Sequence, residues 1–201
     1  GVYFLSGGGT KFWEDREDGR NIAEEVKADG YTYVRTKEDL MAVEEGPVIA
    51  LMDSYELKPS LDRGDILPAS VTKALELLDN KKGFFLMVES AIIDGYGHNN
   101  DSEGMIEEMH EFDQALKALI QYVNTHPNTL LVVTADHETG GTGVAYQSHK
   151  VNQPEGLHLN FSTKGHTGTV VPIFAYGAGA AKFSGIFQNR ELPEMIEELI
   201  K

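Results

Sequence analysis

The chain has 201 residues, with 17 Lys or Arg against 32 Asp or Glu, so its formal net charge is −15. This charge disfavours nucleic acid and acidic lipid surfaces as partners, because both are polyanions. With 41% hydrophobic residues the chain can bury a sizeable core, and no run approaches the ~18 apolar residues of a membrane-spanning helix. The absence of cysteine excludes disulfides, thiolate zinc sites and cysteine nucleophiles.

The first part of the chain alternates between strand-like and helix-like segments. Gly30 is typical of a helix C-cap, and Ser70 is the expected N-cap of a later helix. Residues 53–68 contain two prolines and are expected to be irregular. The expected strands are residues 2–5, 31–35 and 47–52, and the expected helices are residues 21–28, 37–44 and 70–78.

The second part of the chain has clearer patterns. Its apolar residues recur at spacings of three and four between Ser102 and Val123, which predicts one long amphipathic helix. Because the expected strands are apolar throughout, we expect an α/β fold with a mainly parallel sheet covered by helices on both faces. The further expected strands are residues 84–88, 130–134 and 170–176, and a last helix is expected from Asn189 to Ile200.

Titratable side chains follow or precede these later strands. In sheets of this kind, ligands bind beyond the carboxyl ends of the strands. Neutral imidazole and carboxylate are the usual zinc ligands where thiolates are absent, and a catalytic zinc takes about three protein ligands. The sequence therefore predicts a metal site at this edge. The candidate ligands are Glu89, Asp94, His98, Asp136, His137 and His166.

The local spacing of the candidates leaves their conformation open. Asp94 and His98 are four residues apart and would align on one helical turn, but Gly95 and Gly97 favour a loop. Asp136 and His137 reach one ion only if the chain bends there, and the following Thr-Gly-Gly at 139–141 permits that bend.

Each candidate also has a plainer interpretation. Glu89 is equally explained as a strand-end carboxylate, and Asp94 and His98 as ordinary loop residues. The pair of titratable residues that ends a buried strand at 136–137 is harder to explain without a function. No role is assigned to the histidines expected on a helix surface, at a helix end and in loops, which are His110, His126, His149 and His158.

Three strings together resemble the C-terminal half of bacterial alkaline phosphatase. They are Val-Glu at 88–89 with Ile-Asp at 93–94 and His-Asn-Asn-Asp at 98–101, Thr-Ala-Asp-His-Glu-Thr-Gly-Gly at 134–141, and Gly-His-Thr at 165–167. The second string is a highly specific signature of that family. Gly-Gly-Gly at 7–9, Asp-Gly-Arg-Asn at 18–21 and Phe-Asp at 112–113 also fit, so residues 1–201 are expected to be half of one α/β domain without an internal boundary.

The resemblance implies a role for each candidate ligand. Asp94, His98 and His166 would hold a first zinc, Asp136 and His137 a second zinc, and Glu89 a magnesium. It further implies the hydrolysis of phosphate monoesters through a phosphoserine intermediate, in a homodimeric enzyme of the periplasm or the cell exterior.

The chain also departs from the family pattern. The family's nucleophilic serine lies in an Asp-Ser-Ala-type motif of the N-terminal half, as do a further metal-binding aspartate and a phosphate-binding arginine, and none is found here. Asp53-Ser54 is followed by Tyr55, and Ser102 is better explained as a helix N-cap. We therefore expect that this chain corresponds to roughly half of an enzyme. Alone, it should hold at most one tight zinc and be inactive, and its own N-terminal half should be a partner.

Two other interpretations remain open. Phosphodiesterases, phosphonate hydrolases and cofactor-independent phosphomutases of the same superfamily share the Asp-x3-His and Asp-His pairs. Glu89 and the Thr-Gly-Gly at 139–141 favour the monoesterase. A noncatalytic metal-binding or interaction module that kept the ligands without the chemistry is the second alternative.

Overall fold

The structure, a computed structural model, describes residues 1–145 and 158–200. Its contacts divide the chain into two compact units, Gly1–Ser90 with Glu107–Ala118, and Ala91–Ile106 with Leu119–Lys201. The long helix α7 (Ser102–Thr125) therefore contributes its middle to the first unit and its ends to the second. No helix in the described ranges is long and apolar enough to cross a membrane. Strands and helices alternate along the chain, which confirms the expected α/β class.

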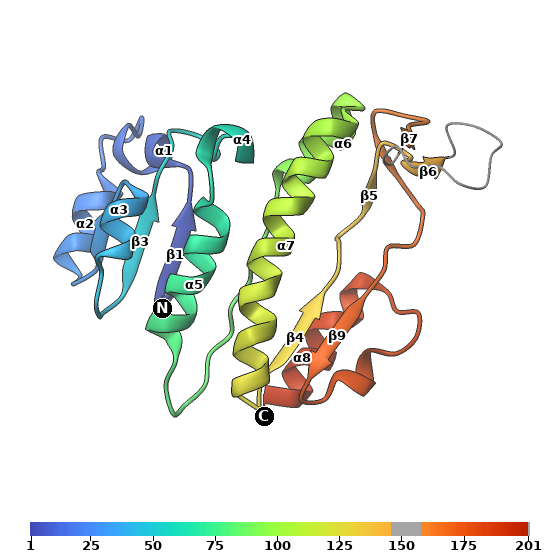
Figure 1. Ribbon diagram of the computed structural model, residues 1–201. Coiled ribbons are helices and arrows are strands. Elements are labelled where there is room, and N and C mark those ends of the chain that lie inside the picture. The colour runs from blue at the N-terminus through green and yellow to red at the C-terminus, as the bar shows by residue number, and fades with distance from the viewer. Residues whose placement is uncertain (146–157, 201) are drawn as a thin grey trace. The chain divides into compact units, whose positions relative to one another are not determined.

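The first unit is built on a three-stranded parallel sheet (Figure 1). Its order is β1 (Phe4–Gly7), β3 (Val48–Leu51), β2 (Thr32–Val34). All residues of β3 are buried, because this strand is paired on both sides. The helices of this unit are α1 (Thr10–Glu14), α2 (Ile22–Ala28), α3 (Lys37–Met41), α4 (Ser60–Arg63) and α5 (Ile66–Leu78).

The core of this unit lies between β3 and α3. Leu40 and Val43 pack there against Val48 and Ala50, and each is buried. Burying a large aliphatic side chain contributes about 1.5–3 kcal/mol. The strand predicted at 47–52 and the helix predicted from residue 37 are therefore both present, although α3 ends at Met41 instead of residue 44.

Residues 53–68 are more regular than expected. They contain α4 and the start of α5, which begins at Ile66 after the N-cap Asp65 instead of at Ser70. Pro68 lies in the first turn of α5, where the missing N–H costs nothing because it would have no partner within the helix. Ser70 is buried inside α5, with its Oγ 2.9 Å from the Oγ of Ser6.

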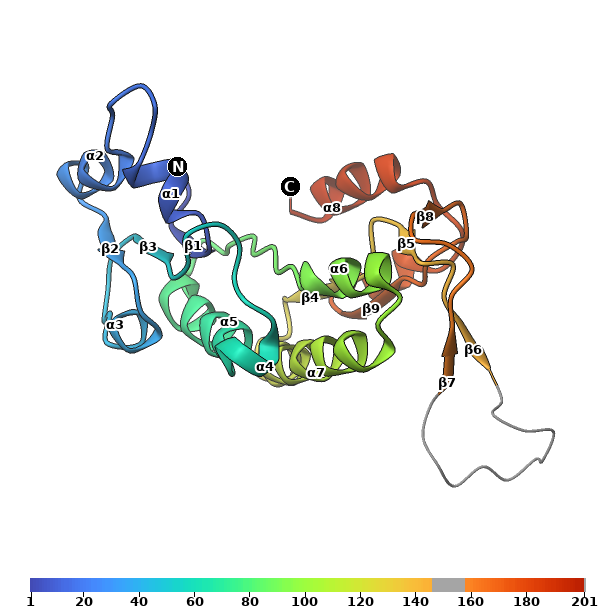
Figure 2. The same cartoon turned by 90° about the horizontal axis from the view of Figure 1, so that it is seen from above.

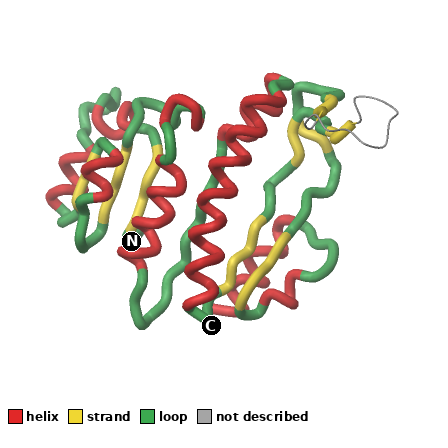
Figure 3. Tube along the Cα trace, in the orientation of Figure 1, coloured by secondary structure: helices red, strands yellow, loops and turns green. Residues whose placement is uncertain are grey.

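The strand expected at residues 84–88 is not formed. Residues 83–90 have no regular secondary structure (Figure 3). The alternation of a strand is nevertheless present, because Phe85 and Met87 are 65% and 76% exposed while their neighbours are half-buried. A segment with such a pattern forms a strand only where another strand pairs with it. No strand in the described part of the chain pairs with this segment.

The second unit contains three antiparallel strand pairs. Parallel pairing is therefore confined to the first unit among the described residues. The strand expected at 170–176 forms only from Phe174 onward, and residues 189–191 form a 3-10 turn before the last helix. The pairs are β4 (Leu130–Val133) with β9 (Phe174–Gly177), β5 (Glu138–Thr139) with β8 (His166–Thr167), and β6 (Gly143–Ala145) with β7 (His158–Asn160). The helices are α6 (Ile92–Asn99), the short 3-10 helix η1 (Ala180–Phe183) and α8 (Leu192–Ile200).

A buried ionic cluster fastens α4 to the middle of α7. The guanidinium of Arg63 contacts the carboxylates of Glu108, at 2.8 Å, and Glu111. Glu108 is fully buried and also accepts the backbone N–H of Ser60 at 2.6 Å, while Glu111 accepts the N–H of Leu67 at 3.3 Å. The two carboxylates therefore pair with Nη2 of Arg63 and accept backbone N–H groups at the start of two helices.

We expect Arg63→Met to lower the free energy of unfolding by about 3–5 kcal/mol, because it leaves two buried carboxylates without a cation. Glu108→Gln should cost less, since Glu111 still pairs with Arg63. Arg16→Met is the matched control, because its partner Asp18 is exposed and the pair should contribute far less. Urea unfolding of the variants measures the difference, and equal effects of Arg63→Met and Arg16→Met would contradict the assignment.

Candidate metal centre

The helix α6 carries the first two candidate ligands. The prediction of a loop around Gly95 and Gly97 is wrong, because both glycines lie inside α6. Asp94 and His98 are therefore one helical turn apart. Glycine costs about 1 kcal/mol in a helix. Packing explains Gly97, because a Cβ there would lie only 3.0 Å from Cγ2 of Thr139. The glycine thus lets α6 approach β5 closely.

The pair β5–β8 carries the next two candidates. Thr139 lies opposite His166 in this antiparallel ladder, and His137 immediately precedes β5. The imidazole rings of His137 and His166 stack with centroids 3.6 Å apart. Gly140 continues the turn at φ 88°, a left-handed conformation that glycine adopts without strain. The bend expected at 139–141 is therefore present.

Four candidate side chains meet at one point. Ligand atoms of Asp94, His137 and His166 all lie within 4.8 Å of one another. His98 joins them, with its Nε2 3.1 Å from Nε2 of His166 and 3.3 Å from Oδ2 of Asp94. The second carboxylate oxygen, Oδ1 of Asp94, lies 3.5 Å from Nε2 of His166. Imidazole and carboxylate in this number fit a zinc ion.

The hydrogen bond on the far side of His98 directs its other nitrogen into this cluster. Nδ1 of His98 lies 2.5 Å from the carbonyl oxygen of Lys164. A carbonyl only accepts, so Nδ1 carries a proton, and in the neutral imidazole Nε2 then has a free lone pair. Such a carbonyl behind a histidine is the usual support of a metal-binding imidazole.

The hydroxyl of Thr139 orients two further ligands. It donates to Oδ1 of Asp94 at 2.5 Å and lies 3.2 Å from Nδ1 of His137. Because a hydroxyl has one proton, which goes to Asp94, Nδ1 of His137 must be the donor to Thr139. In the neutral imidazole Nε2 of His137 then has the free lone pair, and it faces Oδ2 of Asp136 at 3.1 Å. Facing lone pairs repel unless a proton or a cation lies between them, so the arrangement has a place for either.

Glu138 holds the turn that carries these groups. Its carboxylate accepts the backbone N–H groups of Gly141, at 3.1 Å, and Thr142, at 2.7 Å, and the hydroxyl of Thr167. The hydrogen bond from Thr167 and then that from Thr142 keep the pKa of Glu138 below its ordinary value. Glu138 therefore ties β5 to β8 as a carboxylate and leaves the metal-binding positions to its neighbours.

The remaining candidates lie outside this meeting point. The side chain of Asp136 is 85% exposed and contacts His137. Glu89 is exposed and belongs to the first unit, so its part in a metal site stays a prediction. Ser102 is the first residue of α7, whose N-cap is instead Asp101.

Three of the four histidines without an assigned role lie in the described part of the chain. His110 is exposed on α7 and His126 caps the end of that helix. His158 begins β7 and so lies in a strand instead of the expected loop. His149 lies outside the described residues.

Sequence reasoning missed the supports of the site. Thr139, Glu138 and the carbonyl of Lys164 were not singled out as functional, although the first two belong to the string at 134–141. A threonine between a glutamate and two glycines suggests only a bend. Its contact with Asp94, 45 positions away, needs the fold.

We expect Thr139→Val to weaken zinc binding by about tenfold to a hundredfold, because it keeps the shape but removes both hydrogen bonds of the hydroxyl. Thr139→Ser, which keeps the hydroxyl, is the matched control and should bind nearly as the parent does. Competition against a chromophoric chelator measures both affinities. Equal affinities for the valine and serine variants would contradict the role of the hydroxyl.

The sequence and the fold of the chain both have relatives among known proteins. Residues 5–158 match the family model described as alkaline phosphatase. Alkaline phosphatase 4 of Bacillus subtilis is 29% identical to the chain, and the match covers 96% of this chain and 57% of the relative. The chain thus spans little more than half the length of that relative.

Solved structures of the same family share the fold. The alkaline phosphatase of the Antarctic bacterium TAB5 matches with a TM-score of 0.89 and 30% identity, over 98% of this chain and 60% of that structure. A variant of the same enzyme, solved with Mg bound in its M3 site, matches with a TM-score of 0.87 and 29% identity over the same shares. Since the family model covers most of the sequence and the fold agrees, the chain belongs to the alkaline phosphatase family.

Proposed function

We propose that this chain is the metal-binding half of an enzyme that hydrolyses phosphate monoesters. The observation that carries the proposal is the meeting of Asp94, His98, His137 and His166, in which His98 and His137 donate from Nδ1 and turn Nε2 toward neighbouring ligand atoms. Membership of the alkaline phosphatase family supports the same reaction class.

We assign a first zinc to Asp94, His98 and His166, and a second to Asp136 and His137. The two oxygens of Asp94 support the first assignment, because one faces His98 and the other faces His166. The contact between Asp136 and His137 supports the second. Glu89 is assigned to a magnesium, in keeping with the related structure that has Mg bound.

The chain's own residues prepare this chemistry. When bound, paired dications supply the positive charge that stabilises a phosphoryl group during its transfer. Thr139 holds Asp94 and His137 in place, and Glu138 holds the strands β5 and β8 together. The nucleophile is assigned to a serine of the N-terminal half. That serine takes the phosphoryl group from the substrate oxygen and gives it to water.

The N-terminal half is also the proposed partner of this chain. Phe85 and Met87 are exposed on an extended segment that no described strand pairs with. A further strand beside this segment would cover part of these side chains and satisfy its backbone. We further propose that the whole enzyme is a homodimer of the periplasm or the cell exterior, in keeping with its bacterial relatives.

The isolated chain should retain at most one zinc ion after dialysis. The first zinc has three protein ligands here, the second has two and the magnesium has one, and affinity falls steeply with each lost charged ligand. Elemental analysis of the dialysed protein measures the stoichiometry. Two or more tightly held ions per chain would contradict the assignment of half a site.

The isolated chain should not hydrolyse p-nitrophenyl phosphate, since it has no nucleophile of the family type. Addition of a segment from a family member that carries the Asp-Ser-Ala motif should raise turnover, and His166→Ala should abolish that gain. Steady-state release of p-nitrophenol is the measurement. Robust turnover by the chain alone, lost in His166→Ala, would place the nucleophile within these residues and overturn the proposal.

A further inference from the structure

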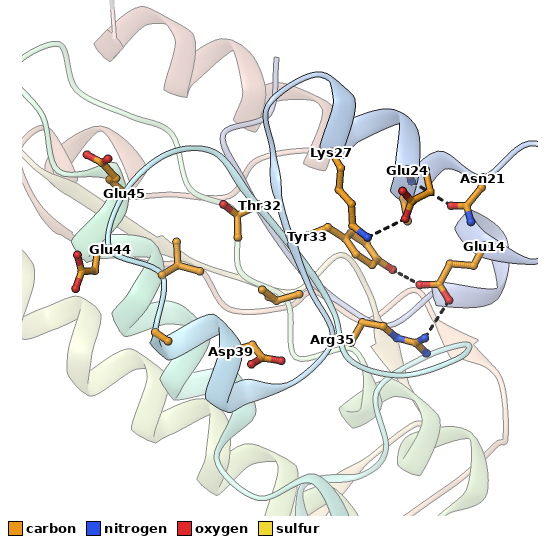
Figure 4. Close-up of a pocket in the computed structure, with 14 residues that line it drawn as sticks. Glu14, Asn21, Glu24, Lys27, Thr32, Tyr33, Arg35, Asp39, Glu44 and Glu45 are labelled. Atoms are coloured by element: carbon orange, nitrogen blue, oxygen red, sulfur yellow. Dashed lines mark hydrogen bonds and ion pairs between the residues drawn. The ribbon is translucent and has the colours of Figure 1, made fainter.

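A groove of about 860 Å³ lies in the first unit (Figure 4). None of the candidate metal ligands lines it. Its lining includes β2, which is one of the two outer strands of the sheet and pairs only with β3 among the described strands. The helices α2 and α3 supply residues to its two sides, and Figure 2 shows them on opposite faces of β2. The groove therefore runs along an open strand edge between two helices.

The backbone of β2 is suited to pair with another strand. Thr32 donates its N–H to the carbonyl of Pro47 at 2.9 Å, on the β3 side. Because successive residues of a strand alternate in the direction of their backbone groups, the N–H and C=O of Tyr33 face the open edge. An unpaired strand edge is a template for an extended peptide, whose main chain supplies the matching donors and acceptors.

The aromatic side chain of Tyr33 is held rigidly beside this edge. Its hydroxyl donates to Glu14 at 2.8 Å, and its ring stacks on Trp13 with centroids 6.4 Å apart. Burial and the hydrogen bond to Glu14 raise the pKa of Tyr33, so that the hydroxyl remains a donor. The groove wall is thus ordered before any ligand arrives, which lowers the cost of binding.

The charges of the groove favour a basic occupant. Arg35 pairs with Glu14 at 3.1 Å and Lys27 with Glu24 at 2.8 Å, so these four charges compensate one another. The carboxylates that line the groove without an ion-pair partner among the described residues are Asp39, Glu44 and Glu45. At this groove these carboxylates would repel another acidic surface, such as that of a second copy of the chain with its net charge of −15, whereas they would attract a basic peptide.

We propose that this groove docks an extended peptide segment bearing Lys or Arg side chains, which adds to the open edge of β2 as a fourth strand. The main-chain hydrogen bonds at Tyr33 give the alignment. The carboxylates of Asp39, Glu44 and Glu45 select positive side chains. This binding function is separate from the metal centre and does not depend on it.

The test titrates the chain with the pentapeptide acetyl-Lys-Val-Lys-Val-Lys-amide at low salt. Trp13 is the only tryptophan of the chain and stacks on Tyr33, so its emission reports occupancy of the groove. We expect a saturable change that is at least tenfold weaker with a peptide that is N-methylated at all of its backbone nitrogens, because it cannot donate to the strand edge in either orientation. A glutamate version of the peptide should not bind.

Substitutions on the protein separate the groove from general electrostatics. The double variant Glu44→Gln, Glu45→Gln should bind the lysine peptide at least tenfold more weakly. The matched control Glu103→Gln, Glu107→Gln removes the same charge from exposed positions outside the groove and should bind as the parent does. Equal binding of the N-methylated peptide, equal weakening by both double variants, or no saturable signal would overturn the proposal.

Discussion

One hydroxyl group, that of Thr139, joins the two segments from which the candidate metal centre is built. It donates to Asp94 on α6 and accepts from His137 at the start of β5. The contact is possible because Gly97 has no side chain where α6 meets Thr139. Without this close approach Asp94 and His137 would have no common support. The geometry of the site thus rests on a small residue that admits a neighbouring hydroxyl.

Much of the site was predictable from residue types and local order. Histidines and aspartates beside apolar, strand-like segments indicate a ligand-binding edge, and Asp94, His98, His137 and His166 do converge. The elements with strong periodicity were also predictable, among them β3 and α7. These signals are local, since each depends on side chains within a few positions of one another.

The features that escaped prediction depend on distant contacts. The glycines at 95 and 97 favoured a loop, but this segment is a helix. In the helix Gly97 packs against Thr139, and Asp94 contacts His98 one turn away. The strands β5 and β8 have two residues each, too few for any periodicity to appear. Conversely, the apolar run at 84–88 has the right pattern and lacks a partner strand in the described chain. A pattern shows what a segment can form, and its partner decides whether it forms.

The proposed groove along β2 and the candidate metal centre would use separate kinds of chemistry in one fold. The candidate metal centre offers side-chain ligand atoms, and hydrogen bonds on the far side of two imidazoles direct them. The groove uses the main chain of an outer strand and the charge around it. Each depends on the contacts of its own unit.

The central claim is that Asp94, His98 and His166 form one ion site with unprotonated imidazole nitrogens. Zinc-edge X-ray absorption of the chain loaded with one equivalent of zinc tests this most directly. The account predicts nitrogen and oxygen neighbours at about 2.0–2.2 Å, with the outer-shell scattering of two imidazoles that is lost in part in His98→Ala. A spectrum with oxygen neighbours alone, unchanged in His98→Ala, would contradict it.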